Sequence, residues 1–251
     1  MVAIILAAGY ATRLYPLTEN RPKALLPIGG KPILDYIIEQ IRTIPAVERT
    51  VVVSNDKFHG HFESWANEKE DARADARRRL IVLNDGTRSE ETRLGAIGDM
   101  DFAISEAGID EDILVIAGDN FFTYRLIDLY DFYRRADADC VVVKKIEDRE
   151  ALKSLGVAIV DSEGRVVEFE EKPQNPRSDL AVFATYLYRR ETLPLIREYL
   201  RQGNKPDAPG NFPAWLCRRQ RVAAYPFSGE CYDVGTPEAY AALCAAYASG
   251  L

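Results

Sequence analysis

The residues best suited to chemistry lie in a loop near the start of the chain. Residues 6–32 read LAAGYATRLYPLTENRPKALLPIGGKP and follow the apolar run Val2 to Leu6, which is typical of a buried parallel strand. Gly9 allows the backbone to turn sharply and to approach a ligand, and the amides of such a turn attract anions. Arg13 and Lys23 add fixed positive charge, and prolines within the loop stiffen it. Together these features favour a triphosphate site.

Taken one at a time, these features have simpler explanations. Most surface arginines and lysines only keep a protein soluble, and a glycine after a strand is ordinary in α/β proteins. The loop also lacks the GxxxxGK[ST] and GxGxxG patterns of two better-known phosphate-binding loops. The prediction therefore depends on the joint pattern.

Two aspartates are candidate ligands of a magnesium ion. Asp119 lies in AGDN, directly after the apolar run Ile113 to Ala117, and Asp233 lies in YDVGTPEAY. Carboxylate oxygens at a strand end suit Mg²⁺, which prefers oxygen ligands. A helix start is the alternative explanation for both aspartates. After Asp233, Thr236 followed by Pro237 is a good beginning for the last helix. That alternative leaves Asp233 itself unexplained.

Two weaker patterns complete the candidates. Asn84 follows the third expected strand, and its amide can both donate to and accept from the imide edge of thymine or uracil. A turn over residues 84–86 explains the same asparagine at least as well. Glu171, Lys172 and Pro173 end another expected strand, and a charged pair before a proline is a common strand end.

An alternation of strands and helices must position these residues. Such alternation implies right-handed crossovers and a mostly parallel sheet, with ligands at the carboxyl ends of its strands. The expected strands are Val2 to Leu6, Thr50 to Ser54, Leu80 to Asn84, Ile113 to Ala117 and Asp139 to Lys145, and the expected helices are Ile33 to Ile44, Phe58 to Glu70, Thr92 to Ala107 and Leu126 to Ala136.

After Lys145 the pattern changes. We expect strands over Gly156 to Val160, Val166 to Glu170 and Ala181 to Tyr188, and helices over Glu191 to Arg201, Phe212 to Arg219 and Thr236 to Ala248. They predict a β-rich subregion packed against the first sheet, within a single domain of residues 1–251. The charged stretch 68–79 is expected to be a solvated helix end, with Asp75 and Arg79 spaced for an ion pair.

The composition is that of an ordinary soluble globular protein. A net charge of −7 argues against a nucleic-acid surface, so local cations must capture any anionic substrate. The four cysteines show no CxxC spacing and are expected to be free thiols in a reducing compartment. No apolar run approaches the ~20 residues of a membrane helix, and no secretion signal is recognisable. We therefore expect a cytoplasmic protein with no membrane or nucleic-acid partner.

Residue by residue, the opening loop resembles the signature of sugar-phosphate nucleotidylyltransferases, LAAGxxTRLxPLTxxxPKxLLPIxxKP. Within that family, it resembles glucose-1-phosphate thymidylyltransferases and their uridylyl relatives. The resemblance implies an α/β fold with a Rossmann-like, mostly parallel central sheet flanked by helices, of the nucleotide-diphospho-sugar transferase type. Residues 1–145 would mainly bind the nucleotide, residues 146–235 would mainly bind the sugar, and residues 236–251 would form a C-terminal helix. The family often forms dimers or tetramers, so a homo-oligomer is an expected partner.

The resemblance also implies roles for single residues. It makes Asp119 and Asp233 the ligands of Mg²⁺, and Arg13 and Lys23 the catalytic cations. The implied nucleotide-binding residues are Leu6, Ala8, Gly9, Thr12, Arg13, Lys23, Asn84 and Gly95, and the implied sugar-phosphate-binding residues are Asn120, Gly156, Glu171, Lys172 and Ala184. Two positions depart from the family pattern. Cys231 stands where tryptophan is common, and Ala184 stands where many relatives have glycine, so its methyl group would narrow the sugar pocket.

The implied reaction joins a nucleoside triphosphate, with dTTP or UTP favoured, to a sugar 1-phosphate, with glucose 1-phosphate favoured. The products are a nucleotide sugar and pyrophosphate, and Mg²⁺ is the cofactor. A phosphate monoester has a second pKa of ~6 and is already nucleophilic at neutral pH, so the reaction needs no catalytic base.

Other functions stay open. One is a non-catalytic sensor of nucleotide sugars, which would lack a loop cation or a metal aspartate. Another is a cytidylyl or guanylyl transferase acting on a different phosphate. A dinucleotide oxidoreductase is disfavoured, because the first turn lacks the second and third glycines that such cofactors need.

Overall fold

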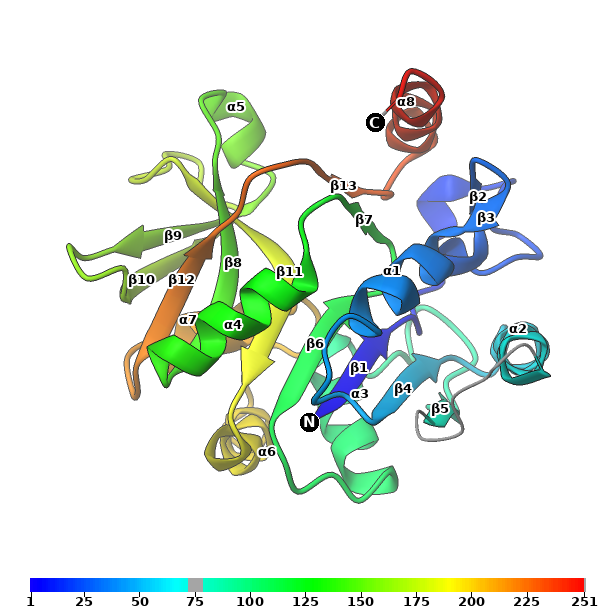
Figure 1. The fold of residues 1–251 in the computed structure, drawn as a ribbon, viewed down its shortest axis with the longest axis horizontal. Helices are drawn as coiled ribbons and strands as arrows, with labels where there is room; N and C mark the ends of the chain where they lie inside the picture. The colour runs from blue at the N-terminus through cyan, green and yellow to red at the C-terminus, as the bar shows by residue number, and fades with distance from the viewer. Residues whose placement is uncertain (72–78, 251) are drawn as a thin grey trace.

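The computed structural model describes residues 1–71 and 79–250, and a mixed β-sheet of nine strands forms its core (Figure 1). The strand order is β10-β9-β11-β6-β1-β4-β5, with β8 paired to β11 and β12 paired to β8. The strands are β1 (Val2–Leu6), β4 (Arg49–Ser54), β5 (Arg79–Asn84), β6 (Ile113–Ala117), β8 (Asp139–Lys145), β9 (Gly156–Val160), β10 (Val166–Glu171), β11 (Leu180–Tyr188) and β12 (Val222–Pro226).

The centre of the sheet is parallel and buried. Strands β6, β1, β4 and β5 pair in parallel, and β1 carries the buried run Val2 to Ile5, as expected for strands covered on both faces. Leu6, the last residue of β1, lies opposite Val53 on one side and Ala117 on the other. The carboxyl ends of these strands therefore meet at one edge. The predicted α/β class with a mostly parallel central sheet is confirmed.

Helices cover both faces of the sheet. Alternate residues of β1 enter two different cores: Ala3 and Ile5 face one, and Val2 and Ile4 face the other, following the two-residue period of a strand. The first core includes side chains of α1 (Ile33–Ile41), α2 (His59–Asp71), α4 (Leu126–Ala136) and α8 (Pro237–Ala248). The second includes side chains of α3 (Ala96–Glu106), α6 (Leu193–Arg201) and α7 (Asn211–Leu216). In Figure 1 α1 and α4 lie in front of the sheet and α7 lies behind it.

The predicted β-rich subregion is present, but it does not pack against the first sheet. Strand β11 pairs antiparallel with β6 and joins β8 and β9 to the parallel strands. The second half of the chain thus continues the same sheet. Edge-to-edge pairing of this kind has no local sequence signature, because it depends on which distant strand pairs with the open edge of β6.

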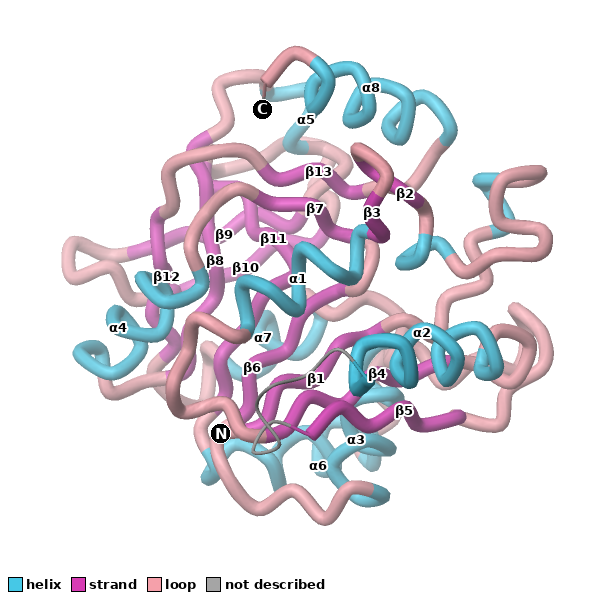
Figure 2. Tube along the Cα trace, turned by 45° about the vertical axis from the view of Figure 1, so that its right-hand side comes forward, coloured by secondary structure: helices cyan, strands magenta, loops and turns pink. Residues whose placement is uncertain are grey.

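Several short elements were not predicted. They are the strand β12, the 3₁₀ turns η1 (Thr12–Leu14), η2 (Lys23–Leu25) and η3 (Arg190–Thr192), the strands β2 (Pro27–Ile28), β3 (Lys31–Pro32), β7 (Asn120–Phe122) and β13 (Cys231–Asp233), and the helix α5 (Arg149–Leu152). Strands β7 and β13 form an antiparallel pair and run side by side in Figure 2. Cys231 in β13 lies opposite Phe122 and packs against the first core.

Most predicted helix and strand boundaries are close to the observed ones. The largest difference is at α3, which begins at Ala96 and not at Thr92, because Gly95 has a φ of 79° and ends the preceding loop. Helices α1 and α7 each end three residues earlier than predicted. Helix α8 begins as predicted, with Thr236 accepting a hydrogen bond from the backbone N–H of Ala239 at 3.2 Å. The proposed ion pair of Asp75 with Arg79 lies outside the described residues. Within residues 1–71 and 79–250, no helix is both long and apolar enough to cross a membrane.

Candidate active site

The opening loop is tied to the carboxyl edge of the sheet by backbone groups. The N–H of Ala7 donates to the carbonyl of Val53 at 2.9 Å. The side-chain amide of Asn55, which is fully buried, donates to the carbonyl of Ala8 at 2.8 Å. Further along, the hydroxyl of Thr18 donates to the carbonyl of Ala11 at 2.7 Å. These bonds hold the loop that carries Arg13 and Lys23 over the ends of β1 and β4.

The two candidate metal ligands lie together. Asp119 follows β6 and precedes β7, and Asp233 ends β13, where it pairs with Asn120 of β7. The N–H of Val234 donates to the carbonyl of Asp119 at 3.2 Å. Burial, and then the charge of Asp119, raise the pKa of Asp233. Two carboxyl groups that lie close enough to act on each other form a good oxygen-donor set for a divalent cation.

Basic side chains surround this acid pair. The ammonium group of Lys23 forms an ion pair with Asp119. The charges of Lys23, Arg13 and Lys172 each lower the pKa of Asp233, which places all three near its carboxyl group. A Cβ atom added to Gly235 would lie 3.7 Å from a guanidinium nitrogen of Arg13 and 3.6 Å from Asp233. The structure therefore brings together the loop cations and the acids from distant parts of the sequence.

Lys172 has an unusual backbone conformation. Its φ is 49°, in the left-handed region that non-glycine residues rarely occupy. Its N–H donates to the carbonyl of Leu155 at 3.1 Å and so holds the turn after β10. Strained residues of this kind are concentrated at functional sites. The strain supports a role for the EKP segment beyond ending a strand.

Two adjoining cavities lie over this edge of the sheet. The first, which we call the loop cavity, has a volume of about 450 Å³ and is lined by Leu6, Ala7, Gly9, Tyr10, Ala11, Thr12, Arg13, Lys23, Ala24, Glu90, Arg93, Gly118, Asp119 and Lys172. The second, the α3 cavity, has a volume of about 280 Å³ and is lined by Leu6, Ala8, Gly9, Arg93, Gly95, Ala96, Asp99, Ala117, Asp119, Asn120, Ala184, Asp207, Pro209 and Asp233. They share Leu6, Gly9, Arg93 and Asp119. The loop cavity is rich in cations, and the α3 cavity is rich in acids.

Most of the predicted site residues line these cavities. Of the predicted set, Leu6, Ala8, Gly9, Thr12, Arg13, Lys23, Gly95, Asp119, Asn120, Lys172, Ala184 and Asp233 do so. A roomier cavity of about 750 Å³ lies between α3 and α6, away from all of them. Two arginines in its wall, Arg190 and Arg197, are paired with Asp110 and Asp101. We place the candidate active site where the predicted residues converge.

Gly156 and Glu171 face each other across β9 and β10 but do not line either cavity. A Cβ atom at Gly156 would lie 2.8 Å from Phe169 and 3.2 Å from the carboxyl group of Glu171. A Cβ atom at Gly210 would lie 2.7 Å from the same carboxyl group. Burial raises the pKa of Glu171. The two glycines make room for this acid, and its contact with a sugar stays a prediction.

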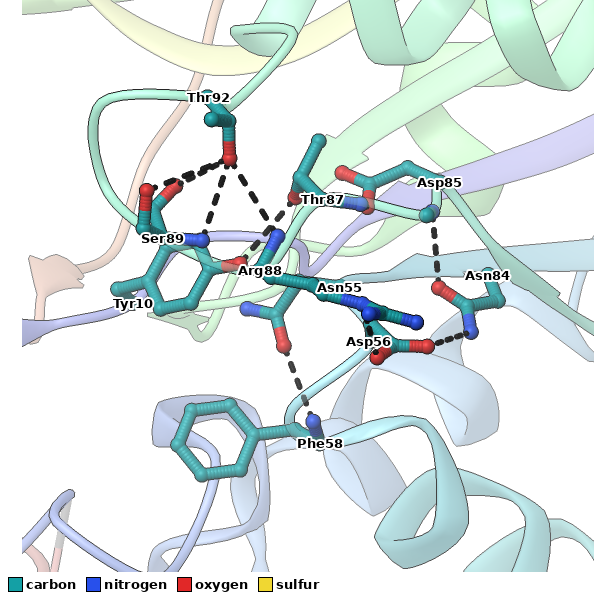
Figure 3. A network of polar contacts seen from close by, with 11 residues as sticks. Tyr10, Asn55, Asp56, Phe58, Asn84, Asp85, Thr87, Arg88, Ser89 and Thr92 are labelled. Carbon is teal, nitrogen blue, oxygen red and sulfur yellow. Dashed lines mark hydrogen bonds and ion pairs between the residues drawn. The ribbon is translucent and has the colours of Figure 1, made fainter.

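Asn84 forms a turn and does not line either cavity (Figure 3). Its side-chain oxygen accepts from the N–H of Gly86 at 2.9 Å, and its amide donates to Asp56 at 2.9 Å. The turn explanation is therefore the one that the structure supports. No feature of the described geometry makes this amide available to a nucleobase.

Sequence reasoning left other residues of the site out. Arg93 was placed near the expected nucleobase region but not among the site residues, and it lines both cavities, is ion-paired with Glu90 and lies 3.2 Å from Asp207. Asp99 lines the α3 cavity from the first turn of α3. Asn55 holds the loop through the hydrogen bond of its side-chain amide to the carbonyl of Ala8. Of these residues, only Asp99 could have been recognised from the sequence, because an acid between Ile97 and Met100 on an otherwise apolar helix face is unusual.

Comparisons with known proteins show which proteins this chain resembles. A family model described as nucleotidyl transferase matches residues 2–250. A glucose-1-phosphate adenylyltransferase from Thermomicrobium roseum is 31% identical over 259 residues, which cover 96% of this chain and 58% of that protein. A UTP–glucose-1-phosphate uridylyltransferase, AglF, from Haloferax volcanii is 28% identical over 198 residues, which cover 75% of this chain and 72% of that protein.

Several other curated relatives are longer, and the chain spans 52% to 60% of their length. Among solved structures, a UDP-glucose pyrophosphorylase complexed with UDP-glucose superposes with a TM-score of 0.82 at 22% identity. The superposition covers 100% of this chain and 99% of that one. At that identity the superposition establishes the shared fold.

Proposed function

Because the chain belongs to the nucleotidyl transferase family, we propose that it transfers a nucleotidyl group from a nucleoside triphosphate to a sugar 1-phosphate and releases pyrophosphate. The observation that carries this proposal is that Asp119 and Asp233 lie together, with Lys23 paired to Asp119 and Arg13 close to Asp233. These four residues come from three separate segments of the chain. A charged arrangement of this kind suits two phosphorylated substrates that must be brought together.

The chemistry requires positioning and charge more than proton transfer. A phosphate oxygen of the sugar 1-phosphate attacks the α-phosphorus of the triphosphate, and the bond from that phosphorus to the oxygen bridging to the β-phosphate breaks. The electron pair leaves with pyrophosphate. The attacking monoester is largely dianionic at neutral pH, so no base has to remove a proton. The main barrier is repulsion between the two anions, which fixed cations lower.

Each cation has a place in this scheme. Arg13, in the loop cavity, would hold the β- and γ-phosphates and the leaving pyrophosphate. Lys23, which is paired with Asp119, would contact the α-phosphate. Lys172 lines the same cavity from the other half of the chain and would contact the phosphate of the sugar.

Asp119 and Asp233 would hold Mg²⁺. Their carboxyl oxygens suit a hard cation. Burial, followed by the charge of Asp119, raises the pKa of Asp233, and a nearby cation would favour its ionised form. When bound, the ion would supply positive charge that offsets the charges of the two phosphorylated reactants. Lys23, already paired with Asp119, would share this compensation.

The identity of the two substrates is a finer question. The resemblance of the opening loop favours dTTP or UTP with glucose 1-phosphate. Relatives are named for adenylyl and for uridylyl transfer to glucose 1-phosphate. The amide of Asn84, which had suggested thymine or uracil, is engaged in a turn. The donor base must therefore be determined independently of that residue.

The rival function is a non-catalytic sensor of nucleotide sugars. Such a protein would be expected to lose a loop cation or a metal aspartate, and here Arg13, Lys23, Asp119 and Asp233 are all present. The deciding experiment is a matrix of nucleoside triphosphates against sugar 1-phosphates, scored by pyrophosphate formation with Mg²⁺ and with a chelator. Formation of pyrophosphate that needs both substrates and the metal supports an enzyme. Tight binding of nucleotide sugars without any turnover supports the sensor.

A further inference from the structure

Arg93 is a cation of the loop cavity that the proposed reaction does not use. Among the described residues, four cationic side chains line this cavity, namely Arg13, Lys23, Arg93 and Lys172, and the other three already have a role in that reaction. Arg93 also lines the α3 cavity, and 42% of its side chain is exposed. Its position beside both cavities calls for an explanation.

Arg93 forms ion pairs with one acid from each cavity. One terminal guanidinium nitrogen pairs with Glu90, which lines the loop cavity, and the other lies 3.2 Å from Asp207, which lines the α3 cavity. A guanidinium group carries five N–H donors, so these two contacts leave donors for a third partner. A phosphate group suits them, because the planar guanidinium can bind two phosphate oxygens at once.

The backbone on both sides of Arg93 is held by hydrogen bonds. The hydroxyl of Thr92 accepts from the N–H of Ser89 at 3.2 Å and donates to the Ser89 carbonyl at 3.1 Å (Figure 3). Beyond Arg93, the N–H of Ala96 donates to the carbonyl of Asp207 at 3.3 Å. Arg93 is therefore positioned at the cavity wall before any ligand binds, and a preorganised group loses less entropy on binding.

Glu90 would oppose a triphosphate in the loop cavity. Among the described residues, Glu90 and Asp119 are the acids that line this cavity, and Asp119 is the proposed metal ligand. A carboxylate that faces a polyanion repels it. The ion pair with Arg93 offsets this repulsion in part, but it also makes Glu90 a competitor for the arginine.

We infer that Arg93 binds the phosphate chain of the donor nucleotide and that Glu90 competes with that chain for it. The inference rests on the proposed function, because it takes the loop cavity as the triphosphate site. At about 450 Å³, the cavity is small enough that a triphosphate filling it would lie near all of its walls. The alternative is a structural role, in which Arg93 only ties the loop before α3 to Asp207.

The test measures the calorimetric affinity for inorganic tripolyphosphate, which has no base and no sugar, in the wild type and in purified, folded variants. We expect Arg93→Ala to weaken this affinity about tenfold, because a charge-assisted contact is lost. We expect Glu90→Gln to strengthen it about two- to fivefold, because the competing charge is lost. Asp207→Asn breaks the tie between the loop and Asp207 but keeps the cation, so it should not weaken the affinity.

Arg88→Ala is the matched control. Arg88 lies in the same loop, pairs with Asp56 at 3.1 Å and lines neither cavity, so this substitution should leave the affinity unchanged. An affinity that Arg93→Ala leaves unchanged would overturn the inference. Equal losses in Arg93→Ala and Asp207→Asn would also overturn it, in favour of the structural role. Weaker binding by Glu90→Gln would show that Glu90 does not compete.

Activity separates this inference from the proposed function. Pyrophosphate formed by Arg93→Ala with an unchanged KM for the nucleoside triphosphate defeats this inference alone. No pyrophosphate from any pair of substrates defeats the proposed function, and the affinities for tripolyphosphate then still decide whether Arg93 binds a phosphate chain.

Discussion

At the scale of single residues, Arg13 is the side chain on which the proposed chemistry depends most directly. It lines the loop cavity, and its charge acts on Asp233. We expect Arg13→Ala to lower turnover about 10²- to 10³-fold, because a preorganised cation at the leaving group is lost. The measurement is pyrophosphate release by the purified, folded variant. Arg125→Ala, which removes an exposed arginine paired with Asp128, is the control and should keep full activity. Undiminished turnover in Arg13→Ala would remove this residue from the mechanism.

Asp119 is both a predicted ligand of Mg²⁺ and the ion-pair partner of the loop residue Lys23. Replacing it with asparagine removes one charged oxygen donor and the partner of Lys23. We expect Asp119→Asn to raise the Mg²⁺ concentration for half-maximal rate by at least about tenfold. The measurement is a magnesium titration of the initial rate, with Asp128→Asn, an exposed acid, as the control. Identical titration curves for the variant and the wild type would exclude Asp119 as a ligand.

The opening loop and Asp119 were predictable as candidate site residues because each follows an apolar strand whose carboxyl end can be recognised locally. Asp233 was assigned from the resemblance, since the short strand β13 that it ends was not predicted. Asn84 also follows an apolar strand, and there the local pattern allowed two outcomes. Its side chain completes a turn with Gly86 instead of facing a ligand. Glu171 and Gly156 were predicted from the resemblance, and the structure pairs them but leaves them outside both cavities. Burial of a polar side chain depends on residues far away in the sequence, and this explains why Asn55 and Asp99 were missed.

At the scale of elements, the start of α3 fixes the wall of the α3 cavity. Gly95 has a φ of 79°, and a Cβ atom there would lie 2.8 Å from the backbone carbonyl group of Pro206. Gly108, just beyond the other end of the same helix, has a φ of 57° and open space around it. Both glycines occupy a conformation that alanine disfavours, but only Gly95 also meets backbone atoms.

This difference predicts the outcome of a pair of substitutions. Gly108→Ala should lower the free energy of unfolding by about 1 kcal/mol through backbone strain. Gly95→Ala should lower it by at least about 1 kcal/mol more, because the loop at Pro206 must also move. Urea denaturation of both variants measures the two effects. Equal losses would show that the contact with Pro206 does not constrain this helix start.

The sequence was informative about elements and less informative about how they pair. Apolar runs and helical spacing located the strands and helices of the parallel half within a few residues, since both signals are local. Strand β12 and the pair of β7 with β13 escaped prediction. The strand β13 is only three residues long, and its partner lies far away in the chain. That short pair nevertheless brings Asp233 to Asp119, so the least predictable element completes the site.

At the scale of the whole molecule, charge is separated between the two cavities. The chain carries a net charge of −7, yet Arg13, Lys23, Arg93 and Lys172 all line the loop cavity. Acids collect instead in the α3 cavity, which contains Asp99, Asp207 and Asp233. A triphosphate would therefore be drawn to one side of Asp119 and repelled from the other. This separation orients the substrate before any specific contact forms.

The same collection of buried acids predicts how stability depends on pH. Burial is the main cause that raises the pKa of Asp99 to about 8; the charge of Asp85 adds to the shift, and the charge of Arg93 opposes it. Burial also raises the pKa of Asp139, to about 6. Both values lie above the ordinary 3.8. The folded state therefore binds more protons than the unfolded state. The stabilising effect of each bound proton is complete below about pH 4 and is lost as the pH rises through the pKa of that acid in the folded protein.

Asp99→Asn should remove this loss between about pH 4 and pH 8. Each pKa unit corresponds to about 1.4 kcal/mol, so the variant should gain stability relative to the wild type as the pH rises from 5 to 8.5, by at most about 4 kcal/mol. Urea denaturation at several pH values measures the gain. Asp139→Asn is the control, because its gain should end near pH 6, where the folded-state pKa of Asp139 lies. Parallel stability curves for Asp99→Asn and the wild type over this range would show that Asp99 is ionised in the folded protein.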